Sequence, residues 1–154
     1  MKLAEALTAR ADLQRRIEQL RARITANARY QEGEEPAEDA AALLGEAEAA
    51  LGQLRDLIRR INATNARLAL GADGTMTDAL AARDVLRLQH SLLADAAAAA
   101  SGTNSGMRQM RSELRQIAAL PVAELRAAAD GVAQELRELD NRIQQANWTH
   151  DIEE

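Results

Sequence analysis

The sequence predicts an all-α protein, an elongated antiparallel helical hairpin or bundle of about four helices. The first observation is a heptad stripe over residues 122–146, where apolar or small residues recur at alternating spacings of three and four. A second stripe follows over 44–68, interrupted only by Asn65. The third observation is composition: the 154 residues include no Phe, one Trp and one Tyr. Helical cores can be built from aliphatic side chains alone, so these features favour a single helical domain over 1–154.

The first two helices are expected over about residues 2–30 and 37–70. Gly33 is suited to end the first helix and Pro36 to open the second, because glycine is common just past a helix end and proline fits a first helical turn. At roughly 1.5 Å per residue, each helix would be about 45–50 Å long. Helices of this length in so small a chain predict an elongated protein or one paired with another copy.

A third helix is expected over about residues 76–99, after the glycine loop 71–74, and a fourth over about 122–148. The part between them, 100–120, is expected to be irregular or a short extended segment, although its arginines could also line a short helix. The apolar arc of the third helix has two sides, and an arc that wide is covered by two neighbours. One side holds Ala81, Val85, Leu88 and Leu92, and the other holds Leu86 and Leu93.

Charge and composition exclude several classes of function. The formal net charge of −5 argues against nucleic acid as the main partner, since phosphate binding needs a basic surface. Glu5 and Arg10 interrupt the apolar run that a secretory signal would need, and no stretch approaches the roughly 20 apolar residues of a membrane span. The chain has no Cys, which excludes disulfides and thiolate metal sites. We therefore expect a cytoplasmic protein that binds neither nucleic acid nor membrane.

Five residues in or beside the apolar pattern are the candidates for an interface or a polar seam: Arg10, Asn27, Asn65, His90 and Trp148. A seam amide at Asn27 or Asn65 can fix helix register and oligomeric state, with a substrate-binding amide as the alternative. A guanidinium on the apolar stripe, at Arg10, must extend outward or meet a carboxylate from the second helix or a second subunit. The indole of Trp148 is expected to cover the end of a neighbouring helix, the alternative being a solvent-exposed tail.

No constellation of residues indicates catalysis, a cofactor or a metal. His90 lies at helical spacing from Arg83 and Arg87, and two cations would repel a metal ion. The acidic turn 32–39 lacks the alternating ligands and central glycine of a calcium loop. The sequence also has no phosphate-binding glycine loop and no nucleophile elbow. We therefore expect that the protein is not an enzyme, with no catalytic residue, cofactor or metal site.

Five sequence blocks occur in order over nearly the whole chain. They are Arg10–Gln14, Gln31–Pro36 with Glu38, Ile61–Asn65, Thr77–Leu80 with Arg83 and Asp84, and Leu139–Gln144 ending in Asn147 and Trp148. Together they resemble a family of small bacterial proteins known as septicolysins. The resemblance implies an all-helical protein whose activity is poorly understood, and the family name suggests a cytolysin.

These observations predict a self-associating helical-bundle protein with a structural or interaction role, present as a homo-oligomer. The alternative is a binding module that holds a metal or small ligand between helices, using Arg10, Asn65 and His90. A membrane-active, cytolysin-like protein is the third possibility, which the absence of an aromatic-rich insertion surface disfavours.

Overall fold

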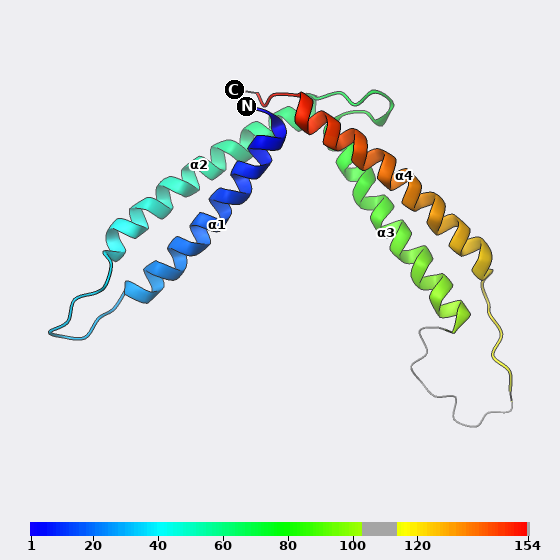
Figure 1. Cartoon of the computed structure of the whole chain (residues 1–154), viewed down its shortest axis with the longest axis horizontal. Helices are drawn as coiled ribbons and strands as arrows, with labels where there is room; N and C mark the ends of the chain where they lie inside the picture. The colour runs from blue at the N-terminus through cyan, green and yellow to red at the C-terminus, as the bar shows by residue number, and fades with distance from the viewer. Residues whose placement is uncertain (103–113, 154) are drawn as a thin grey trace. The chain divides into compact units, whose positions relative to one another are not determined.

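The computed structural model describes residues 1–102 and 114–153. No strand forms among the described residues, although isolated antiparallel bridges join Lys2 to Asp151 and Ala69 to Thr75. The all-α prediction is confirmed. The regular elements within the described ranges are α1 (Leu3–Asn27), α2 (Ala40–Arg67), the short 3₁₀ helix η1 (Gly71–Asp73), α3 (Met76–Ser101) and α4 (Val122–Thr149) (Figure 1).

The helix ends differ from the predicted ones by a few residues, and α2 shows why. Its first turn is capped by Asp39, whose carboxylate accepts hydrogen bonds from the backbone N–H of Ala41 at 2.9 Å and of Ala42 at 3.2 Å. The helix therefore begins after this cap and not directly after Pro36. Between α3 and α4, residues 114–121 are neither helix nor strand. The rest of the segment predicted to be irregular, 103–113, lies outside the described residues.

The chain divides into two compact units. Unit 1 contains Met1–Leu68 together with the chain from Gln144 onward, and unit 2 contains Ala69–Ile143. The helix α4 contributes to both of them. Among the described residues, no helix is long and apolar enough to cross a membrane.

Unit 1 is an antiparallel hairpin of α1 and α2, which lie side by side (Figure 1). Its core includes Leu20, Leu43 and Ala47, with Ile24 packed against them. An ion pair from Arg16 of α1 to Glu46 of α2 connects the two helices, and a second one joins Arg23 of α1 to Glu38 in the connection just before α2. The later arginine of α1 thus pairs with the earlier of the two acids, as the antiparallel register of the hairpin requires.

The end of the chain adds to unit 1 through backbone hydrogen bonds. Leu3 N donates to His150 O at 2.9 Å, and Ile152 N donates to Met1 O at 3.0 Å. Glu153 N donates to Thr64 Oγ1 at 2.9 Å, and Arg60 Nε donates to Glu153 O at 2.8 Å. These bonds attach the C-terminal segment to the start of α1 and the end of α2, where Ile152 is buried.

Unit 2 pairs α3 with α4 up to Ile143 in a second antiparallel hairpin (Figure 1). α3 begins at a capping box, in which Asp78 N donates to Thr75 Oγ1 and Thr75 N donates to Asp78 Oδ2. The hydrogen bonds from Thr75 lower the pKa of the Asp78 carboxyl. The buried apolar residues of unit 2 are mostly small or medium in size: Met76, Ala79, Ala97, Ala129, Val132, Leu139 and Ile143.

Candidate functional site

A stripe of exposed apolar residues runs along α3. Val85, Leu88 and Leu92 keep 61%, 71% and 70% of their surface exposed. Their spacings of three and four residues place them on one face of the helix, and exposed Ala81 continues the same face. Leu86 and Leu93, the other side of the predicted arc, are half-buried. We call Ala81, Val85, Leu88 and Leu92 the α3 stripe; the described residues of the chain leave this side of the arc largely uncovered.

A groove of about 400 Å³ lies between the α3 stripe and α4. Ala81, Ala82 and Val85 contribute to it from α3, and Leu139 contributes from α4. The ion pair between Arg142 and Asp73 borders the groove, with Arg142 Nε at 2.6 Å from Asp73 Oδ2. An apolar floor with a charged border can accept an apolar side chain.

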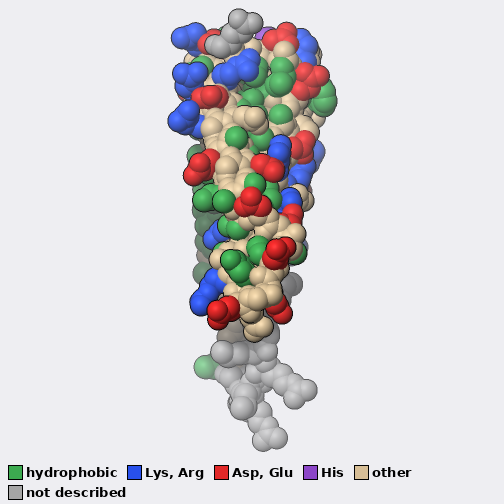
Figure 2. All heavy atoms as spheres, turned by 90° about the vertical axis from the view of Figure 1, so that its left-hand side faces the viewer, with side chains coloured by type: hydrophobic (Ala, Val, Ile, Leu, Met, Phe, Trp, Pro, Cys, Tyr) green, Lys and Arg blue, Asp and Glu red, His purple; other side chains and the backbone are tan. Residues whose placement is uncertain are grey.

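Unit 1 has a second, less exposed apolar face on α2. Leu44 and Leu51 keep 51% and 50% of their surface exposed, whereas Ala47 and Ile61 of the same heptad pattern are buried. Ile58 and Asn65 continue the exposed column at seven-residue spacing and are half-buried. We call Leu44, Leu51, Ile58 and Asn65 the α2 seam. Figure 2 views the side on which the α1–α2 hairpin lies and shows hydrophobic side chains at the surface between charged ones.

Arg10 is half-buried on α1, as its place inside the apolar stripe predicts. Within the described part of the chain, its guanidinium forms no ion pair. The two hairpin-spanning ion pairs use other arginines of α1, Arg16 and Arg23. The carboxylate that the sequence led us to expect for Arg10 is therefore not supplied by the described residues of its own chain.

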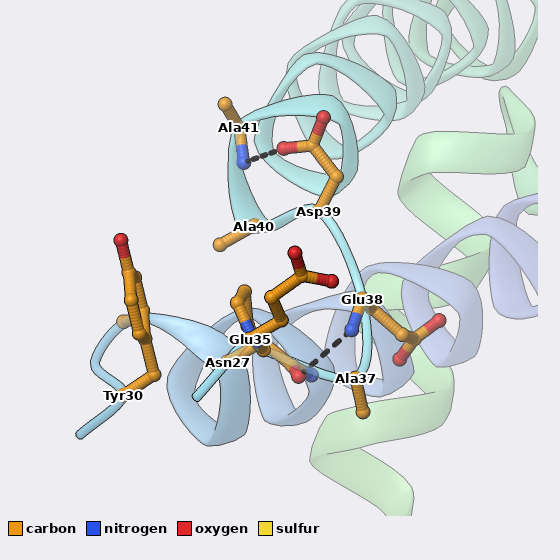
Figure 3. A pocket seen from close by; sticks show the side chains of 10 residues that line it. Asn27, Tyr30, Glu35, Ala37, Glu38, Asp39, Ala40 and Ala41 are labelled. Carbon is orange, nitrogen blue, oxygen red and sulfur yellow. Dashed lines mark hydrogen bonds between the residues drawn. The ribbon is translucent and has the colours of Figure 1, made fainter. Parts of the chain in front are cut away.

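Asn27 stabilises the connection between α1 and α2. Its Oδ1 accepts a hydrogen bond from Glu38 N at 3.1 Å (Figure 3). Its Nδ2 donates to Arg23 O at 2.9 Å. A depression of about 560 Å³ beside it is also lined by Tyr30 and Glu35. The hydrogen bond from Arg23 lowers the pKa of the Glu38 carboxyl and raises the pKa of Arg23. Asn27 therefore holds the loop locally, and its polar atoms are engaged within its own chain.

Asn65 lies on α2 in unit 1, and His90 lies on α3 in unit 2. The Oδ1 atom of Asn65 is buried and has no hydrogen-bond partner among the described residues. His90 lines a cavity of about 350 Å³ together with Arg126 and Asp130. No group of three or more His, Cys, Asp or Glu residues in the described ranges could hold a metal ion.

Trp148 is 63% exposed, so the described residues of its own chain leave most of the indole uncovered. Its docking on the end of a neighbouring helix therefore stays a prediction. Sequence reasoning missed the exposure of Leu44 and Leu51. Their heptad spacing was the available signal, but such spacing identifies a seam without saying which neighbour covers it.

Fold and surface together define an all-α protein of helical hairpins with uncovered apolar faces. The chain belongs to a family of unknown function, DUF6847, whose model it matches over residues 10–152. It is similar to a solved structure described as a functionally unknown conserved protein from Corynebacterium diphtheriae, with 37% identity, a TM-score of 0.90 and 99% of each chain covered. No curated protein matches the sequence. Neither match carries the septicolysin name, so that resemblance stays a prediction.

Proposed function

We propose that this protein is a self-associating helical protein with a structural or interaction role, and that its working form is a homo-oligomer. The observation that carries the proposal is the α3 stripe, whose large residues are mostly exposed. A contiguous apolar surface on a folded chain indicates an interaction site. In an all-helical protein, the covering partner that the chain always has available is another copy of itself.

The size of the α3 stripe decides how much free energy it can contribute to self-association. Covering a side chain such as Leu88 gains roughly 1–2 kcal/mol, since full burial of a Val or Leu is worth about 1.5–3 kcal/mol. Three such residues per copy give roughly 6–12 kcal/mol in a dimer, against an association cost of about 4–15 kcal/mol. The α3 stripe alone therefore supports weak association, and a stable oligomer requires a further contact surface.

The proposal includes the absence of catalysis. Alanines line much of the cavities near Asn27, His90 and Leu139, and four of the charged residues there are engaged in local pairs or a cap: Glu38, Asp39, Asp73 and Arg142. Arg10 and Asn65 belong to unit 1 and His90 belongs to unit 2, so no observation favours the alternative of a ligand held by these three. An interaction role requires only the surface already described.

The proposal is tested by measuring the mass of the native protein with light scattering coupled to gel filtration at micromolar concentration. The parent is expected at a multiple of 16.7 kDa. Leu88→Glu should shift it toward the monomer with its helicity unchanged, because it places a charge on the uncovered face. The matched control is Ala127→Glu, which adds the same charge at an exposed alanine of α4. A monomeric parent that unfolds cooperatively would overturn the proposal.

A further inference from the structure

We infer that the α2 seam of one copy packs on the α3 stripe of a second copy, and that Arg10 pairs with Asp95 across this contact. The inference rests on the proposed self-association and names its partner surfaces. Two copies related by a two-fold axis would make the contact reciprocally, once from each α2 seam. One type of contact then covers both apolar faces and supplies the additional surface that the α3 stripe alone lacks.

The two faces match in spacing. Leu44 and Leu51 of the α2 seam are seven residues apart, as are Val85 and Leu92 of the α3 stripe. Two helices packed lengthwise repeat their contacts every seven residues, so side chains of one column can fit between those of the other. The small side chain of Ala81 and the adjoining groove of about 400 Å³ leave room at one end of the α3 stripe for a leucine of the α2 seam.

Arg10 lies at the edge of unit 1 where this contact would form. Counting six residues back from Arg16 and six forward from its partner Glu46 reaches Arg10 and Gly52, next to Leu51. At 100° per residue, Arg10 lies about 120° around α1 from Arg16, and Leu51 lies about 140° around α2 from Glu46, each angle taken in the winding direction of its own helix. Because the two helices are antiparallel, these rotations bring Arg10 and Leu51 to the edge of the hairpin opposite the ion pairs. The guanidinium of Arg10 therefore lies beside the α2 seam.

Asp95 is the carboxylate that fits Arg10. It is exposed on α3 three residues after Leu92, which places it on the same side as the α3 stripe. Asp84 borders the stripe too, but Arg83 at 3.6 Å and Arg87 at 3.8 Å already neutralise it. Among the described residues, Asp95 takes part in no ion pair. Within the described residues, Arg10 beside the α2 seam and Asp95 beside the α3 stripe thus each have no ion-pair partner.

A contact of α3 with α3 of the second copy is the competing arrangement. With the two α3 helices parallel, it would bring the Asp95 carboxylates of both copies together, which like-charge repulsion disfavours. It would also leave Arg10 and the α2 seam uncovered. The reciprocal contact of the α2 seam with the α3 stripe satisfies both the charges and the apolar surface, so we prefer it.

Cysteine cross-linking tests the arrangement, because the chain has no native Cys. Differently tagged Leu51→Cys and Leu88→Cys proteins are unfolded together, refolded and treated with a short thiol cross-linker. The mixed product is expected to dominate. Self-linked Leu88→Cys without a mixed product would overturn this inference and leave the proposed self-association intact. An absence of any product with a monomeric parent would overturn both.

Charge exchange tests the ion pair independently. Arg10→Asp and Asp95→Arg should each weaken self-association about tenfold or more, the effect of losing one close interfacial charge pair. The double variant should recover most of the parent affinity, because it restores opposite charges across the contact. Circular dichroism confirms that each variant keeps its helix content. Additive losses in the double variant would overturn the pairing of Arg10 with Asp95.

Discussion

The two helical hairpins use their large apolar side chains in opposite ways. Unit 1 buries Leu3, Leu20 and Ile61 almost completely inside its own hairpin. Unit 2 also buries large side chains such as Met76, but it leaves Leu88 and Leu92 of α3 at the surface with 71% and 70% of their area exposed, more than the roughly half-exposed leucines of the α2 seam. An apolar side chain stabilises the fold in proportion to the area that is buried. The large apolar side chains on the α3 stripe therefore contribute little within the chain, and unit 2 leaves more of its apolar surface for a partner.

Polar contacts do not separate the two units. In unit 1 the ends of the chain are held by an ion pair of 2.9 Å from Lys2 Nζ to Asp151. In unit 2 the ion pair from Arg83 to Asp140 is 3.7 Å long, whereas the one from Arg142 Nε to Asp73 is 2.6 Å. Exposed pairs of this kind add little stability, so they mainly fix where elements meet. The two units therefore differ in the apolar surface that they leave exposed and not in their polar contacts.

The largest expected effect is on the free energy of unfolding. Truncating one large apolar side chain in each unit tests the difference between the units. Ile61 is 1% exposed, so Ile61→Ala should leave a cavity and lower the free energy of unfolding by about 2–5 kcal/mol. Leu88→Ala should change it by less than about 0.5 kcal/mol in the unassociated chain, because its side chain meets mainly solvent there. Chemical denaturation at low protein concentration measures both. A comparable loss for Leu88→Ala would mean that its own chain covers the α3 stripe.

A smaller effect is expected at the start of α3, where unit 2 depends on local polar contacts. Thr75 caps the helix by accepting a hydrogen bond from Asp78 N at 3.2 Å. Thr75→Ala should lower the free energy of unfolding by about 0.5–2 kcal/mol, the usual cost of losing such a cap. Thr77→Ala is the matched control, since Thr77 is exposed and does not cap the helix. Equal losses in both variants would show that the cap is not what stabilises this helix start.

The sequence predicted the helices because their signals are local. Heptad spacing and loop residues such as Gly74 identify each helix, and the two-sided arc around Leu86 and Leu88 predicted two neighbours. It could not show that unit 2 covers only one side of that arc, or that Leu51 is half-exposed, because coverage depends on tertiary contacts. The half-burial of Arg10 followed from its position in the stripe. The exposure of Trp148 did not follow, since a terminal ring can be docked or free.

The smallest expected effect is a loss of stability at acid pH, which tests the contribution of charged side chains in unit 1. In unit 1, hydrogen bonds from Arg23 lower the pKa of Glu38, and hydrogen bonds from Lys2 lower the pKa of Asp151. A carboxyl whose pKa is lowered by folding stabilises the native state above its ordinary pKa. That contribution is lost as the pH falls through the lowered value. Stability should therefore be level from neutral pH down to about pH 5 and fall below about pH 4, where such carboxyls become protonated.

Glu38→Gln isolates the contribution of one carboxyl to this fall. Glutamine has no titrating group, so the variant should be slightly less stable than the parent near neutral pH, and the two should converge as the pH is lowered. Glu48→Gln is the control, because Glu48 is an exposed acid of α2 that forms no ion pair within the described residues. Denaturation midpoints between pH 3 and 7 measure the difference. A Glu38→Gln curve parallel to that of the parent would mean that the contact with Arg23 does not stabilise the α1–α2 hairpin.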